Sequence, residues 1–170
     1  MPARRSLSLV LVMNLTLVMW FAASSWAQEF HGQVVGVQDG DTLTVREEGG
    51  QALRIRLWGV DAPERRQPFS NVAKKHLSDL TFGQRVRVQA RTQDRYGRTV
   101  AVILLPDGRN VNEAMVNDGY AWWFRKYAPY DRTLEKLERE AKEAGRGLWA
   151  DPQAVPPWEF RHSGRLREGQ

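Results

Sequence analysis

Three carboxylates near the ends of predicted strands are the side chains of this sequence most able to do chemistry. Asp41 opens an alternating segment, so the two-residue period of a strand places it on the same face as apolar residues that should fill a core. Asp61 and Glu64 follow the neighbouring alternating segment. A lone charge on a core face is unfavourable, and three acids at one rim repel one another. The cluster therefore requires a cation or arginine partners.

The Asp-Gly pair that precedes Asp41 has a simpler explanation. Asp39 and Gly40 are residue types of a tight hairpin turn, and we expect them to make that turn. On the same interpretation, Asp41 would lie at the edge of the turn in water. The two further carboxylates favour a shared site for Asp41 instead.

The cation that such a cluster would hold is a hard one. The sequence has no cysteine, and its histidines are scattered at His31, His76 and His162, so sulfur or paired imidazole ligands have no support. Oxygen ligands suit calcium or magnesium, and two carboxylates leave coordination positions open for water and a phosphate. The segment from Asp39 is not an EF-hand, because Thr44 stands where that loop needs glycine.

Two arginines could hold a phosphate at the same rim. Arg56 lies on the segment that leads to Asp61, and Arg98 follows a predicted turn at 94–97 into the last strand. A phosphodiester under attack gathers negative charge on its oxygens, and planar guanidinium groups can hold those oxygens in two places. Taken alone, each arginine is equally compatible with an ordinary surface position.

Five short strands and about three helices are expected to position these residues. The predicted strands are 33–37, 42–46, 52–58, 85–90 and 99–105. The predicted helices are 69–80, where Val72, His76 and Leu80 have helical spacing, 110–117, and 132–144 with Asp131 as its cap. A helix between the third and fourth of five strands predicts an α+β, mainly β fold, a five-stranded OB-type barrel.

The first residues have the layout of a secretory signal peptide. Arg4 and Arg5 precede an apolar run at 7–23, and small residues end at Ala27. We predict that residues 1–27 are this signal, cut after Ala27, and that the protein is secreted or periplasmic. The alternative is an uncleaved N-terminal membrane anchor.

The remaining chain is predicted to hold one domain at 28–151 and a basic tail at 152–170. The tail contains three prolines, and we expect it to be extended and partly disordered, with Trp158 packed and Arg161 in solvent. With 170 residues, 42% of them hydrophobic, the chain can bury one core. Its formal net charge of +5 permits contact with nucleic acid without requiring it.

The order and spacing of these residues resemble the staphylococcal nuclease (thermonuclease) family. The resemblance spans about residues 34–149. It rests on Asp39-Gly40-Asp41-Thr42, Ile55-Arg56-Leu57, Val60-Asp61-Ala62-Pro63-Glu64, Asp94-Arg95-Tyr96-Gly97-Arg98 and Val111-Asn112-Glu113-Ala114. It implies the barrel fold and a nuclease that acts on DNA and RNA, with single strands preferred.

The resemblance also implies the roles of individual residues in a calcium-dependent reaction. Asp41 and Asp61 would ligate Ca²⁺ together with the main-chain oxygen of Ala62, where threonine is the more familiar residue. Glu64 would be the general base for the attacking water. The phosphate-gripping arginines would be Arg56 and Arg98. The bond broken would join phosphorus to the 5′ oxygen, leaving 3′-phosphorylated products.

A nucleotide pocket is implied with less agreement in sequence. Tyr96 and Tyr127 resemble tyrosines that contact the nucleotide, and Arg95 stands where the family's type protein has lysine. For Tyr127, core packing is an equal alternative. The loop 65–70 is shorter than in the type protein, which would affect the placement of Glu64.

Two other functions are weighed against the nuclease. A non-enzymatic binding barrel would not need Asp41, Arg56, Asp61, Glu64 and Arg98 together. An envelope-bound calcium-binding protein would need the acids but not the arginines. We expect a monomer with no obligate protein partner.

Overall fold

The computed structural model describes residues 28–168, and it describes side chains as far as Ser163. The predicted signal peptide, residues 1–27, lies outside the described residues and stays a prediction. Within residues 28–168, no helix has the length and apolar character that crossing a bilayer would require.

Five strands close into a barrel, as the alternation of the sequence predicts. They are β1 (Glu29–Val37), β2 (Thr42–Glu47), β3 (Ala52–Leu57), β5 (Arg85–Gln93) and β6 (Thr99–Leu104), in the spatial order β1-β2-β3-β6-β5. The pair β3–β6 is parallel, and the other pairs are antiparallel. Val34, Leu43 and Ile55 fill the interior and are almost fully buried. The OB-type barrel is confirmed.

Two very short strands outside the barrel were not predicted. They are β4 (Val60–Asp61) and β7 (Trp122–Trp123), which pair antiparallel so that Asp61 lies opposite Trp122. Two residues are too few to show a period, and the pairing depends on residues that are 61 and 63 positions apart in the sequence. This small sheet fixes the chain where it leaves the barrel.

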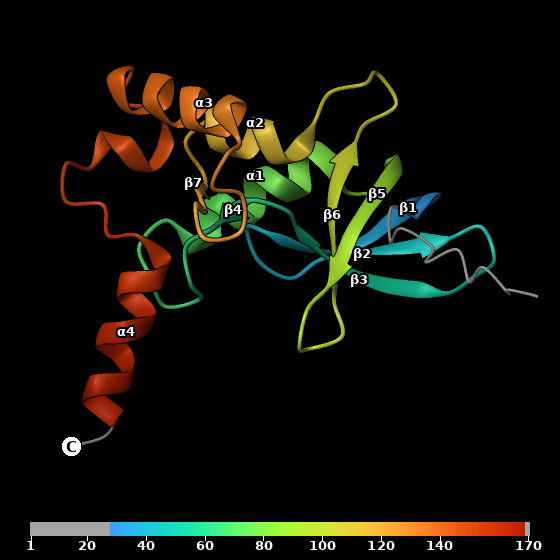
Figure 1. The fold of residues 1–170 in the computed structure, drawn as a ribbon, viewed down its shortest axis with the longest axis horizontal. Helices are drawn as coiled ribbons and strands as arrows, with labels where there is room; N and C mark the ends of the chain where they lie inside the picture. The colour runs from blue at the N-terminus through green and yellow to red at the C-terminus, as the bar shows by residue number, and fades with distance from the viewer. Residues whose placement is uncertain (1–27, 169–170) are drawn as a thin grey trace, which may run out of the picture.

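Three predicted helices form nearly where expected and cover one end of the barrel (Figure 1). They are α1 (Ser70–Thr81), α2 (Val111–Asn117) and α3 (Arg132–Glu143), and a 3₁₀ turn, η1 (Gly147–Ala150), follows. The side chain of Asp131 accepts a hydrogen bond from the Leu134 amide, which confirms it as the cap of α3.

The buried face of α1 lies one residue along from the spacing noted in the sequence. Ala73 and Leu77 are buried, whereas Val72 is 48% exposed. His76 instead lies at the margin, where it stacks on Tyr120. The small and apolar side chains of the helix are therefore buried, and the polar ring of His76 stays partly exposed.

A fourth helix corrects the prediction of an extended C-terminal tail. Residues Pro157–Glu168 form α4, which projects from the helical end of the molecule (Figure 1). Pro157 occupies the first helical position, where a missing amide hydrogen does no harm and the fixed φ favours the helix. Trp158 stacks on Phe124 with ring centroids 5.5 Å apart. The expected packing of Trp158 is confirmed, and the extended tail is wrong for these residues.

Candidate active site

Asp41 is buried immediately before the start of β2. Its side chain is only 5% exposed. Oδ1 accepts hydrogen bonds from Arg56 Nη1 at 2.8 Å and from the hydroxyl of Thr42 at 2.9 Å, and Oδ2 accepts one from the Ala62 amide at 3.1 Å. The bond to Ala62 ties the exit of β4 to the entrance of β2. The buried position expected from strand periodicity is therefore confirmed, and the water-exposed alternative is wrong.

Gly40 has a packing role in addition to its turn. A Cβ at this position would lie 2.7 Å from the Cβ of Ala62 and 2.8 Å from the Cβ of Ala73. The turn thus presses against both the 60–64 segment and α1. Only a residue without a side chain allows the close approach that brings Asp41 to Ala62.

Arg56 joins the two predicted metal-ligating acids. Strand register places it opposite Thr42, one residue from Asp41. Its Nη1 donates to Asp41 and its Nη2 donates to Asp61 Oδ1, each at 2.8 Å. Although burial opposes it, the charges of these two carboxylates raise the pKa of Arg56. Segments far apart in sequence are therefore joined by one guanidinium group.

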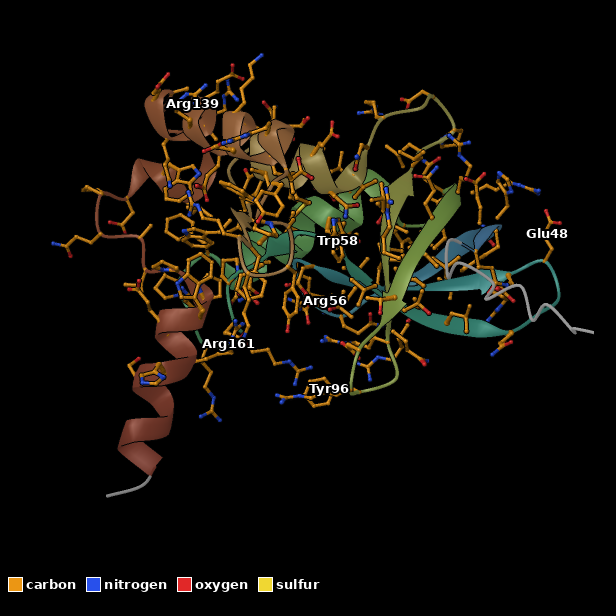
Figure 2. The ribbon with its side chains drawn as sticks, viewed as in Figure 1. Glu48, Arg56, Trp58, Tyr96, Arg139 and Arg161 are labelled. Carbon is orange, nitrogen blue, oxygen red and sulfur yellow. The ribbon has the colours of Figure 1, made fainter. Side chains whose placement is uncertain are left out.

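Arg161 is carried by α4 (Figure 2), and it binds Oδ2 of Asp61, whereas Arg56 binds Oδ1. Arg161 Nη2 donates to Asp61 Oδ2 at 2.7 Å, and its Nη1 donates to Glu64 Oε1 at 2.5 Å. The prediction that Arg161 lies in solvent is wrong. No local sequence pattern indicates that Arg161 belongs to the site. It lies 97 positions from Glu64, in a segment that was predicted to be extended.

The short loop that carries Glu64 is also held by Gln67. Gln67 is buried, its Oε1 accepts the Glu64 amide at 3.0 Å, and its Nε2 donates to the carbonyl of Val155 at 2.5 Å. The backbone of Glu64 is thus tied to the segment that precedes α4. Sequence reasoning missed Gln67, since a glutamine in a polar loop carries no distinctive pattern.

Arg98 lies at the same rim and is oriented by Asp94. Its Nε donates to Asp94 Oδ2 at 2.7 Å, and its Nη1 lies 3.4 Å from the hydroxyl of Thr42, the residue that also bonds Asp41. Burial acts in the opposite direction, but the bonds from Arg98 lower the pKa of Asp94. Asp94 therefore stays charged and holds Arg98 beside the acids.

Of the predicted nucleotide-binding residues, Arg95 and Tyr96 lie beside Arg98, and Tyr127 lies against Phe124. Tyr96 is 66% exposed at the tip of the β5–β6 hairpin, and the guanidinium carbons of Arg95 and Arg98 lie 4.8 and 5.5 Å from its ring centroid. Tyr127 is 55% exposed and meets Phe124 edge to face. Core packing is thus not the main role of Tyr127. An exposed ring leaves a face open for a base to stack on.

Apart from the Arg98–Asp94 pair, carboxylates outnumber guanidinium groups at the rim. The carboxylates belong to Asp39, Asp41, Asp61 and Glu64, and the two guanidinium groups bound to them belong to Arg56 and Arg161. Burial, and then the charge of Asp41, raise the pKa of Asp39 to about 6. Burial also raises the pKa of Asp61, although the bonds from Arg161 act against it. Unbalanced buried carboxylates favour the arrival of a further cation.

The donor chemistry of the rim fits a hard divalent cation. Asp41, Asp61 and the backbone of Ala62 offer oxygen ligands only, which suits calcium or magnesium. Among the described residues, no three acidic or imidazole side chains already converge as a metal cage. In this arrangement the oxygens of Asp41 and Asp61 bond to arginines and to a backbone amide.

Comparison with known proteins finds one matching family and several similar relatives. The chain matches the model of a family described as "Staphylococcal nuclease homologue" over residues 54–151. It is 40% identical to a "Micrococcal nuclease" of Shigella flexneri over 158 residues, which cover 88% of this chain and 90% of that protein. It is 42% identical to an "Uncharacterized endonuclease" of Escherichia coli O157:H7 over 134 residues, 79% of this chain and 86% of the relative. It is 38% identical to "Protein ParB" of Escherichia coli over 176 residues, 98% of each chain.

A closed OB-type barrel that gathers carboxylates and arginines at one rim has the architecture of a barrel nuclease. The chain belongs to the staphylococcal nuclease family. It is therefore a hydrolase whose substrate is nucleic acid and whose target is the phosphodiester bond. The roles given to individual residues remain predictions, although the structure brings Asp41, Arg56, Asp61, Ala62 and Glu64 into direct or shared contact.

Proposed function

We propose that this protein is a calcium-dependent nuclease that breaks the bond between phosphorus and the 5′ oxygen of DNA and RNA. The observation that carries the proposal is the joining of Asp41 and Asp61 by Arg56 at the rim where Glu64 also lies. This arrangement combines ligands for a cation, a donor for a phosphate and a carboxylate able to accept a proton. Such a combination serves hydrolysis of a phosphodiester and exceeds what binding alone requires.

The cation would be held by the carboxylates of Asp41 and Asp61 and the main-chain oxygen of Ala62. When bound, calcium would supply positive charge to the phosphate and to the charge that develops during attack. All three residues are buried, so their positions are fixed by the barrel and by the Asp41–Ala62 hydrogen bond.

Glu64 is the group that we assign to proton transfer. It lies on a loop whose backbone is pinned by Gln67, and its side chain is 39% exposed, so that water and substrate can reach it. A carboxylate in this position accepts the proton of the attacking water. Because Oε1 contacts Arg161, Oε2 is the oxygen that we assign to proton transfer.

Arg56 and Arg98 would hold the phosphate oxygens from two sides. Each guanidinium group has five hydrogen-bond donors, and each uses only part of them on its carboxylate partners. Because those partners fix both groups in advance, little ordering is needed when substrate binds. Tyr96, Tyr127 and Arg95 would contact the neighbouring nucleotide, which favours single strands with accessible bases.

The chemistry is tested by the ends of the products. We expect residues 28–170, which contain the whole described fold, to cut a labelled single-stranded oligonucleotide in calcium and leave 3′-phosphate and 5′-hydroxyl ends. A phosphatase that removes 3′-phosphates, followed by gel mobility and mass measurement, identifies these ends. Products with 5′-phosphates would show that the other ester bond is broken.

Export is proposed on the signal-like residues 1–27. The proposed location is the cell exterior or the periplasm, with membrane anchoring if the segment is not removed. N-terminal sequencing of the exported protein tests it, with Gln28 as the expected first residue; a retained Met1 would contradict cleavage.

A further inference from the structure

Arg161 binds two acids of the site, Asp61 and Glu64, in a forked arrangement. Its Nη2 lies 2.7 Å from Asp61 Oδ2, and its Nη1 lies 3.3 Å from Asp61 Oδ1 and 2.5 Å from Glu64 Oε1. The Asp61 side chain is 1% exposed and the Arg161 side chain is 35% exposed, so the carboxylate end of this contact is shielded from water. A guanidinium fork on a buried carboxylate is a strong interaction.

The contact does not depend on a loose end of the chain. Trp158, one turn before Arg161, stacks on Phe124, and Pro157 is buried. The segment before α4 is held by the hydrogen bond from Gln67 to the carbonyl of Val155. The helix is therefore anchored both to Phe124, which follows β7, and to the loop that carries Glu64. Arg161 lies beyond residue 151, where the match to the family ends.

Arg161 and a divalent cation would have to share the same oxygens. The fork of Arg161 covers both oxygens of Asp61, and Arg56 takes a second position on Oδ1. A cation ligated by Asp61 would lie within a few ångströms of the Arg161 guanidinium group. Like charges at that separation in a shielded site repel strongly.

We propose that Arg161 is a positioning residue that competes with the divalent cation for the Asp61 carboxylate. The inference rests on the proposed cation-dependent function. In the metal-free protein, Arg161 neutralises Asp61 and holds Glu64 beside it. Arrival of the cation requires Arg161 to release Asp61, so α4 sets how tightly the site binds metal.

The consequence is unusual for an ion pair in a binding site, because removing the arginine should strengthen binding of the ligand. Arg161→Gln should bind calcium roughly tenfold more tightly than the unchanged protein, since a charge-assisted hydrogen bond no longer competes. Arg161→Lys keeps the charge but cannot fork over both oxygens, so its affinity should lie between the two.

Calorimetric titration of calcium chloride into residues 28–170 measures this directly. The control is Arg65→Gln, which removes the same charge from the neighbouring loop; Arg65 is exposed and takes part in none of the described ion pairs. Its affinity should change by no more than about twofold, since exposed charges are screened. If Arg161→Gln binds calcium no more tightly than the unchanged protein, the competition does not exist.

The outcomes separate this inference from the function on which it rests. Binding by the unchanged protein with no gain in Arg161→Gln overturns the competition alone. Absence of calcium binding in every variant overturns both proposals. If Arg161→Gln is less stable, the rise in melting temperature caused by calcium supplies a second readout: it should be larger in the variant, whereas a purely structural arginine predicts equal rises.

Discussion

Replacing Glu64 with glutamine should lower the rate of phosphodiester cleavage by roughly 10² or more at saturating substrate. Glutamine keeps the size of the side chain and an oxygen that can accept from Arg161, but it cannot take a proton from water. Initial rates of acid-soluble nucleotide release from single-stranded DNA measure the effect. Affinity for an uncleaved oligonucleotide, measured by fluorescence anisotropy, should change little.

Glu48→Gln is the matched control for this prediction. Glu48 is an exposed acid at the far end of the β2–β3 hairpin (Figure 2), so the same substitution there should leave the rate unchanged. If Glu64→Gln retains a rate within about threefold of the control, Glu64 is not the general base.

The second large effect is expected at Arg56, because this side chain pairs with two buried acids and is also proposed to bind the phosphate. Arg56→Gln leaves Asp41 without its charged partner and Asp61 with Arg161 alone, although these acids are only 5% and 1% exposed. Breaking a buried ion pair from one side costs about 3 kcal/mol or more of the free energy of unfolding. We expect this loss in urea unfolding with chelator present, together with a fall of roughly 10² in cleavage rate.

Arg54→Gln isolates the effect of position from that of charge. Arg54 lies two residues earlier on β3, on the same face by strand period, but it is exposed and lies away from the rim. Its substitution should change the free energy of unfolding by less than about 0.5 kcal/mol. Equal losses in the two variants would mean that the bridge between Asp41 and Asp61 contributes nothing specific.

The strands of the barrel could be predicted because the sequence patterns that specify them are local. Alternation with period two marks each strand, and the turns and the cap at Asp131 lie within a few residues of what they terminate. The short pair β4–β7 was not predictable, since Asp61 and Trp122 meet only after the barrel and helices have formed. The face of α1 was misplaced by one residue because two neighbouring stripes both have helical spacing.

The acids and arginines of the site were visible for a different reason. An acid at a core position, such as Asp41, contradicts the pattern around it and therefore indicates a site. Arg161 and Gln67 are polar residues in polar segments, so the sequence around them does not mark them as unusual. Their importance comes from contacts 97 and 88 positions away along the chain.

The helix α4 could not be predicted from the sequence for the same reason: it depends on contacts with distant residues. Three prolines and a basic composition favour an extended tail, yet Pro157 is compatible with a first helical turn and Trp158 finds an aromatic partner in Phe124. Whether such a segment is helical or extended depends on its tertiary packing. The composition of the segment does not reveal that Phe124 will pack against Trp158.

The central claim is that this barrel cleaves nucleic acid only with calcium held at Asp41 and Asp61. It is tested most directly by the release of acid-soluble nucleotides from single-stranded DNA by residues 28–170, with calcium, with magnesium and with chelator. The account predicts cleavage in calcium that stops when chelator is added and returns with excess calcium. Cleavage that continues unchanged in chelator would contradict the proposed cation, and binding of DNA with no cleavage under any metal would contradict the nuclease itself.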